Sequence, residues 1–207
     1  MKSFIKLFVV LLVFGFGTQA YAQTFAAKAG LNLANMRSED DDDTYSSDYK
    51  TKVGFHLGGT AEFEITDMFS FETGLFLSTQ GYKVNTIFGD YKTNLLYFNI
   101  PITGKARYEF DDFNIYGLFG PYIGLGLSGK VKSGDNSTNI DWGSGEDNDL
   151  KRFDLGITIG AGVEYGPYLA GISYNLGLAN IAAQNDGGYR VKNRVFAITI
   201  GYRFGVD

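Results

Sequence analysis

Apolar and polar side chains alternate with a period of two between residues 113 and 130, over a longer stretch than a soluble strand needs. Typical strands run about 5 to 6 residues, whereas a tilted strand that crosses a bilayer needs about 9 to 11. The pattern therefore predicts a membrane-crossing strand. Its apolar parity holds Phe113, Ile115, Phe119, Pro121, Ile123, Leu125 and Leu127, and its polar parity holds Asn114, Gly120, Tyr122, Gly124, Gly126, Ser128 and Lys130.

The same period predicts strands along the rest of the chain. Connections near Asp67, Asp111 and 166–167 are short, and the others are long and polar, as in outer-membrane barrels. We predict an all-β fold, an eight-stranded antiparallel up-and-down transmembrane β-barrel with short periplasmic turns and long extracellular loops. The expected strands are 25–35, 52–65, 69–83, 95–110, 113–130, 152–165, 168–180 and 194–204, and the expected long loops are 36–51, 84–94, 131–151 and 181–193.

A soluble eight-stranded barrel is the alternative, because it also alternates apolar and polar residues. Glycine distinguishes the two, since it weakens strands and has no use on a water-exposed face but suits a crowded lumen. The apolar parity is therefore expected to face lipid. The glycines of the polar parity are Gly54, Gly58, Gly74, Gly120, Gly124, Gly126, Gly156, Gly160, Gly162, Gly171 and Gly177.

Aromatic residues lie near both ends of the predicted strands, as two belts at the membrane surfaces would require. One belt lies near the short turns and the other near the long loops. The first holds Phe25, Phe63, Phe69, Tyr108, Phe113, Tyr165, Tyr168, Tyr202 and Phe204, and the second holds Phe55, Tyr82, Phe98 and Phe153.

The first 22 residues are typical of a secretory signal peptide, with lysines before an apolar run and the small-x-small site Ala20-Tyr21-Ala22. Cleavage there leaves 23–207 as the barrel domain and removes Lys2 and Lys6, which lowers the formal net charge from −5 to −7. The chain has no cysteine and no basic stripe, so disulfides, thiolate metal sites and nucleic-acid partners are not expected. The expected location is the bacterial outer membrane.

Four segments carry a family resemblance: 97–102 (YFNIPI), 117–124 (GLFGPYIG), 160–165 (GAGVEY) and 193–204 (NRVFAITIGYRF). They resemble the small outer-membrane β-barrel proteins of Bacteroidota that are labelled porin-family or PorT-family, barrels of the OmpA and OmpX type. The resemblance covers nearly all of the mature chain. It implies an eight-stranded barrel inserted by the barrel assembly machinery and supplies no catalytic residues. Family members often carry Glu where this chain has Asn99.

Charged residues of the inward parity gather in the half nearer the short turns. Four acids and four bases sum to zero, and unpaired each would cost several kcal/mol in a narrow lumen. We therefore predict a salt-bridged plug, with Glu72 facing Lys105 or Arg107 and Glu62 reaching Lys28 or Arg203. The outer half holds small or neutral residues and predicts a wet vestibule open to the outside. The charges are Lys28, Glu62, Glu64, Glu72, Lys105, Arg107, Glu164 and Arg203.

Pro101 and Pro121 each lack a backbone donor and should lie nearly opposite each other. They predict a local bulge or kink between the strands at 95–110 and 113–130. The sequence 124–129 (GLGLSG) matches a dinucleotide fingerprint, but that motif needs a following helix, so no nucleotide or other cofactor is expected.

The acidic loops offer carboxylates, and no metal ligand set is predicted from them. Asp135, Ser137, Asn139, Asp141 and Glu146 have EF-hand spacing, but Ile140 stands where that loop requires glycine. A solvated loop is the simpler interpretation. The run 40–43 could still share divalent cations with lipopolysaccharide phosphates.

Three classes of function stay open, with outer-membrane lipids and lipopolysaccharide as expected surroundings. The preferred one is a structural or surface-interaction barrel with a plugged lumen. The second is a narrow porin, transport or secretion-associated component. The third is a lipid-modifying enzyme, for which His56, the only histidine, would be the base and Asp154 the nearest inward acid; we predict no enzymatic activity.

Overall fold

The computed structural model describes residues 23–40, 49–86, 89–134, 136–145, 147–184 and 188–205. The predicted signal peptide lies outside the described residues. Within them, no helix is long and apolar enough to cross a membrane. The strands are β1 (Gln23–Glu39), β2 (Tyr49–Lys50), β3 (Lys52–Glu64), β4 (Phe69–Thr86), β5 (Gly89–Glu109), β6 (Asn114–Ser133), β7 (Asn136–Asn139), β8 (Phe153–Tyr165), β9 (Tyr168–Gly177) and β10 (Arg190–Phe204).

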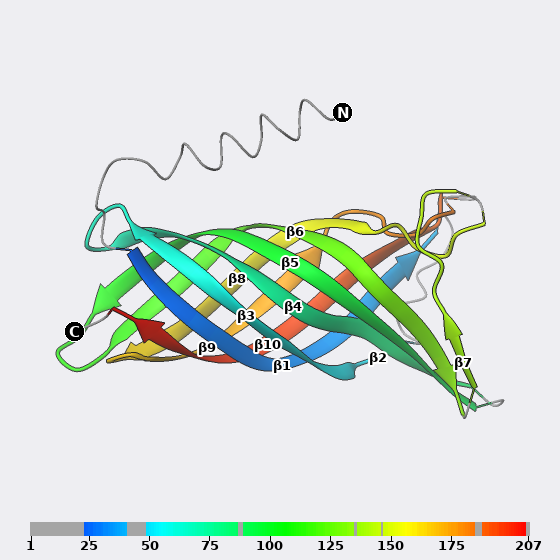
Figure 1. Ribbon diagram of the computed structural model, residues 1–207, viewed down its shortest axis with the longest axis horizontal. Helices are drawn as coiled ribbons and strands as arrows, with labels where there is room; N and C mark the ends of the chain where they lie inside the picture. The colour runs from blue at the N-terminus through cyan, green and yellow to red at the C-terminus, as the bar shows by residue number, and fades with distance from the viewer. Residues whose placement is uncertain are drawn as a thin grey trace.

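Eight long strands close into a ring, and the short strands β2 and β7 extend its wall at one end (Figure 1). The ring runs β4-β3-β1-β10-β9-β8-β6-β5, and β5 pairs again with β4. Each of these pairings is antiparallel, including the closure of β1 on β10, where Phe25 lies opposite Phe204. The predicted all-β, eight-stranded antiparallel barrel is confirmed. We call its two ends the short-turn end and the long-loop end.

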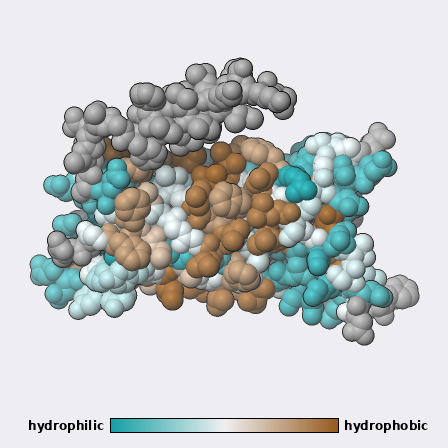
Figure 2. All heavy atoms as spheres, viewed as in Figure 1, coloured by the Kyte–Doolittle hydropathy of each residue, from teal (hydrophilic) through white to brown (hydrophobic). Residues whose placement is uncertain are grey.

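The two faces of the wall differ in chemistry as the alternation predicted. In β6, Tyr116 and Tyr122 are buried inside the barrel while Phe119 between them is 61% exposed. Outward apolar side chains form a band around the middle of the face seen in Figure 2, with mostly polar residues at the long-loop end. Nearly all of the predicted aromatic belt residues face outward. Tyr82 is an exception, because its ring packs inside against Tyr49, with ring centroids 4.3 Å apart.

The wall continues further at the long-loop end than predicted. β4 extends to Thr86 and β5 begins at Gly89, opposite it, so most of the predicted loop 84–94 is strand. The predicted loops 36–51 and 131–151 likewise contain strand residues, including β2 and β7. Loop-like composition did not end these strands because backbone pairing can continue beyond the apolar region without any apolar side chain, provided that no proline interrupts it.

A register shift lies between β5 and β6 at Leu96 and Tyr97. Beyond it the inward parity of β6 changes, since Gly129 is buried whereas Ser128 and Lys130 are exposed. The prediction that Ser128 and Lys130 point inward was therefore wrong. A bulge inserts one unpaired residue, which moves every later side chain to the other face.

The prolines interrupt pairing without shifting the register. The β5–β6 ladder reaches Pro101, opposite Tyr122, and resumes at Gly104, opposite Phe119. Pro121 lies opposite Ile157 of β8. The missing donors locally remove ladder bonds while flanking pairs hold the alignment, so the register shift lies elsewhere, at Leu96 and Tyr97.

Candidate functional site

The eight predicted interior charges all lie on the inner face, towards the short-turn end. Seven are buried, and the side chain of Glu64 is 37% exposed at the end of β3. The antiparallel arrangement brings them together. At the short-turn end, the starts of β4 and β6 pair with the ends of β3 and β5, so inward residues from these parts of the strands lie at the same height. The charges come from six strands, β1, β3, β4, β5, β8 and β10.

Two glutamates and two bases form the centre of this cluster, which we call the ionic cluster. Lys105 Nζ lies 2.8 Å from Glu62 Oε2 and 2.5 Å from Glu164 Oε1. Arg107 donates to the same two carboxylates. Its Nη2 lies 2.5 Å from Glu62 Oε1 and its Nε lies 2.9 Å from Glu164 Oε2. Arg203 Nη1 adds a third cation to Glu164 at 2.9 Å. Each buried charge of the ionic cluster thus has an opposite charge in contact, which offsets the cost of removing it from water.

The individual pairs differ from the predicted ones. Glu72 binds Lys28 at 2.6 Å instead of Lys105 or Arg107, and Glu62 binds Lys105 and Arg107 instead of Lys28 or Arg203. Parity along a strand fixes which face a side chain occupies. Its height and its neighbours across the lumen depend on the stagger of the closed barrel, which sequence periodicity does not contain.

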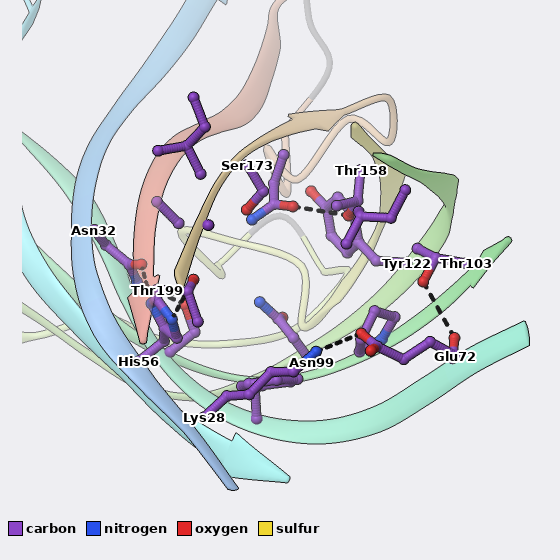
Figure 3. Close-up of a pocket in the computed structure, with 18 of the residues that line it drawn as sticks. Lys28, Asn32, His56, Glu72, Asn99, Thr103, Tyr122, Thr158, Ser173 and Thr199 are labelled. Carbon is purple, nitrogen blue, oxygen red and sulfur yellow. Dashed lines mark hydrogen bonds and ion pairs between the residues drawn. The ribbon is translucent and has the colours of Figure 1, made fainter. Parts of the chain in front are cut away.

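A cavity of about 110 Å³, lined by both polar and apolar side chains, lies inside the barrel beside the Lys28–Glu72 pair. Figure 3 shows side chains from strands around the wall converging on it, among them Asn99, Tyr122 and Thr199. Its volume corresponds to a few water molecules. Asn99 Oδ1 is buried without a hydrogen-bond partner among the described residues, so the cavity retains capacity to bind water or a small polar group.

His56 lines this cavity and is held by neutral partners. Its Nδ1 lies 2.8 Å from Asn32 Oδ1 and its Nε2 lies 3.1 Å from Thr199 Oγ1. Asp154, the predicted acid partner, instead accepts hydrogen bonds through Oδ2 from Tyr122 at 3.1 Å and Asn193 at 2.9 Å. The structure therefore does not assemble the His56–Asp154 pair on which the enzyme alternative depends.

An apolar core closes the long-loop end, where the sequence predicted an open vestibule. Tyr97, which is fully buried, meets Trp142 edge-on, with ring centroids 5.8 Å apart. Backbone hydrogen bonds also hold the loops in place, since Lys151 N donates to Ile181 O and Gly143 N donates to Leu150 O. We call this core the loop cap. It contains Met36, Leu95, Tyr97, Ile140, Ile181, Ala182 and Val191, with Tyr49, Tyr82, Val131, Trp142, Leu150 and Tyr189 packed against it.

The open-vestibule prediction was wrong because it treated the loops as solvated segments. Their composition is polar, but Ile140, Trp142, Leu150 and Ile181 interrupt it. These isolated apolar residues within polar loops were the sequence signal that could have predicted a closed mouth. Burying apolar side chains is favourable when the barrel mouth is within reach of the loop.

Inward glycines make room for interior rings. A Cβ added at Gly126 would lie 2.3 Å from the Trp142 ring, and one at Gly156 would lie 2.4 Å from Tyr122 Cε1. Added Cβ atoms at Gly162 and Gly171 would lie 2.4 and 2.5 Å from the hydroxyl of Tyr116. The glycine-rich parity therefore allows large side chains to fill a narrow lumen, since a ring can lie directly on the backbone of the next strand.

The acidic loop candidates are only partly described. Residues 41–43, Asp135 and Glu146 lie outside the described residues. Asp149 Oδ2 accepts a hydrogen bond from Asp141 N at 2.9 Å. In the described part of the chain, no three His, Cys, Asp or Glu side chains are grouped to hold a metal.

Comparison with protein families matches residues 8–183 to the outer membrane protein beta-barrel domain. The chain belongs to this family. Its inward charges and outward apolar band accordingly lie in a barrel of the bacterial outer membrane, with lipid around the band. No curated protein matches the chain.

Solved outer-membrane proteins are similar to this chain at low sequence identity. Ail, the attachment invasion locus protein of Yersinia pestis, is 18% identical, with 87% of this chain and 98% of that chain covered and a TM-score of 0.43. Neisserial surface protein A is 13% identical, with 87% and 97% covered and a TM-score of 0.46. Outer membrane protein W of E. coli is 22% identical, with 90% and 100% covered and a TM-score of 0.41.

Proposed function

We propose that this outer-membrane barrel does not conduct and acts as a structural scaffold that presents a folded extracellular surface for interaction. One observation carries this proposal: the lumen is filled at two levels by buried side chains. The ionic cluster occupies the half near the short-turn end, and the loop cap occupies the long-loop end.

Each level opposes ion passage for a different physical reason. In the ionic cluster, Lys105 and Glu164 are 2% and 1% exposed and already bind one another, so a passing ion would have to separate buried charges. In the loop cap, the buried rings and aliphatic side chains offer an ion no replacement for its hydration shell.

Planar-bilayer recordings test this function. We expect no steady ohmic conductance from the native barrel, from Arg107→Ala alone or from Trp142→Ala alone, since one closed level remains in each single variant. The combined R107A and W142A variant should conduct, and it also shows that inserted barrels are detected. Steady conductance from the native protein would contradict the proposal.

The cavity between the two levels supports a second candidate, a narrow transport or secretion-associated component of the kind that the PorT-family resemblance suggests. Such a component would hold a small polar solute at Asn99 and His56 while either level opened. The same recordings separate the candidates, because a gated component would show discrete openings of the native protein.

The loop cap should protect the extracellular loops from proteases. Trypsin sites at Lys151 and Arg152 adjoin backbone that bonds to Ile181, and Trp142 covers Gly126. Trp142→Ala removes a large, partly buried ring and should cost at most about 3 to 5 kcal/mol within the cap. We expect cleavage of intact cells or proteoliposomes at Lys151–Arg152 to accelerate by at least about tenfold. Cleavage of Ser144→Ala, an exposed loop residue, should match that of the native chain.

A further inference from the structure

A transverse row of lysines crosses the wall where it extends beyond the apolar band. Lys50 of β2 lies opposite Lys83 of β4, Lys83 lies opposite Lys92 of β5, and Lys92 lies opposite Lys132 of β6. Directly opposite residues of antiparallel strands share a face, with Cβ atoms about 4.5 to 5.5 Å apart. Lys130 lies on that face of β6, opposite Asn94. These five residues are the lysine row.

The lysine row faces away from the lumen. Thr93, next to Lys92, is 5% exposed, and Val131, next to Lys132, packs against the loop cap. Because side chains alternate along a strand, Lys92 and Lys132 project to the outside. Lys50, Lys92, Lys130 and Lys132 are exposed, and Lys83 is half-buried.

The described residues provide almost no compensating charge for this row. None of the five lysines takes part in an ion pair with a described residue. In the described wall segments 79–86, 89–96 and 128–134, Asp90 is the only acid. Like charges directly opposite one another destabilise a sheet, and this concentration of positive charge stands on a chain of formal charge −5. An external anion would relieve the repulsion.

The position of the lysine row indicates which anions are within reach. Leu96 of β5 and Leu127 of β6 are the last apolar outward residues before it. A tilted strand that rises about 3.3 Å per residue places Lys92 roughly 10 Å beyond Leu96. The polar headgroup region extends about 5 to 7.5 Å from the hydrocarbon core on each side, so Lys92 lies just beyond its outer edge and its long side chain can reach it.

We propose that the lysine row binds the phosphate groups of lipopolysaccharide in the outer leaflet beside the barrel. Ammonium groups of neighbouring lysines whose Cβ atoms lie about 5 Å apart can contact more than one phosphate on one lipid and replace the cations that otherwise bridge them. This inference deepens the proposed surface-interaction role. It rests on that proposal because it requires the long-loop end to face the outside of the cell. Its failure would leave the conductance result unchanged, so the two can be distinguished.

Energy transfer between labelled barrel and labelled lipid tests the proposal. The chain has no cysteine, so Thr138→Cys, an exposed site on β7, gives one label position. In phosphatidylcholine vesicles with a minor fraction of labelled lipopolysaccharide, we expect the lipid to be enriched around the native barrel. Lys92→Glu should weaken this enrichment by at least about fivefold, the equivalent of about 1 kcal/mol for one lysine at an anionic surface. Lys132→Gln should weaken it less, and added salt should reduce it throughout.

Matched controls test whether the enrichment depends on the lysine row and on the lipid phosphates. Lys192→Glu makes the same charge change at a lysine outside the row and should leave enrichment near the native value. Lipopolysaccharide with its phosphates removed should not be enriched. Native enrichment in both Lys92→Glu and Lys132→Gln, or equal enrichment of the dephosphorylated lipid, would overturn the proposal. So would row-dependent binding of a soluble sulfated polysaccharide with unchanged lipid enrichment, which would assign the row to a glycan.

Discussion

Glu164→Gln should lower the free energy of unfolding of the barrel by about 3 to 5 kcal/mol, because it leaves buried cations without their shared anion. Glu164 is 1% exposed and contacts Lys105, Arg107 and Arg203. In this variant Lys105 and Arg107 still contact the Glu62 carboxylate. Arg203 loses its ion pair, because Glu164 is the only described carboxylate that it contacts. Equilibrium unfolding in urea, with the barrel in lipid vesicles, measures the loss.

Glu64→Gln is the matched control for this variant. Its carboxylate lies 3.5 Å from Arg107 and is 37% exposed, so the same substitution should cost less than about 1 kcal/mol. The double variant E164Q and R203Q should recover part of the loss, since it also removes the cation left unpaired. Equal, small losses in E164Q and E64Q would show that the ionic cluster is hydrated and does not close the lumen.

Gly156→Val should prevent most of the chain from reaching the folded state. An added Cβ would lie 2.3 Å from Leu176 O and 2.4 Å from the Tyr122 ring, and the strand backbone cannot move away without losing its pairing. Overpacking costs about 1 to 3 kcal/mol or more. Displacement of Tyr122 would also remove a hydrogen bond to the buried Asp154. Heat-modifiable gel mobility of outer-membrane fractions measures the folded share.

Gly117→Val provides the comparison on the opposite face. The nearest atom to an added Cβ there is Gly160 O at 3.9 Å, and the side chain would point into lipid. Because valine favours strands, folding should match or exceed that of the native chain. If G156V folded as well as G117V, interior glycines would not be required for ring packing.

Glu164 and Gly156 both determine how side chains fill the lumen, on which the proposed function depends. Glu164 contacts three cations of the ionic cluster, and Gly156 leaves room for the ring of Tyr122 between the ionic cluster and the loop cap. A barrel that closes its lumen with its own side chains leaves its outer surfaces for interaction. The lysine row and the folded loops lie on those surfaces.

The sequence by itself determined the barrel, its strand number and the face that most strand residues occupy, except beyond the bulge in β6 and at Tyr82. These properties follow from a period of two repeated over strands long enough to cross a bilayer, and from the distribution of glycine, charge and aromatic residues between the parities. The inward position of Lys105, Arg107 and Glu164 could be predicted for this reason, because charge on the lipid side is costly.

Only the tertiary structure decided which residues meet. The partners of Glu62 and Glu72 depend on the stagger of the closed ring, and the bulge at Leu96 and Tyr97 moves Lys130 and Lys132 to the outer face. The lysine row requires the register of four strands, and the loop cap requires loop residues such as Trp142 to reach Tyr97 across the barrel mouth. A local pattern specifies one strand at a time, whereas these contacts depend on strands and loops that are distant in the chain.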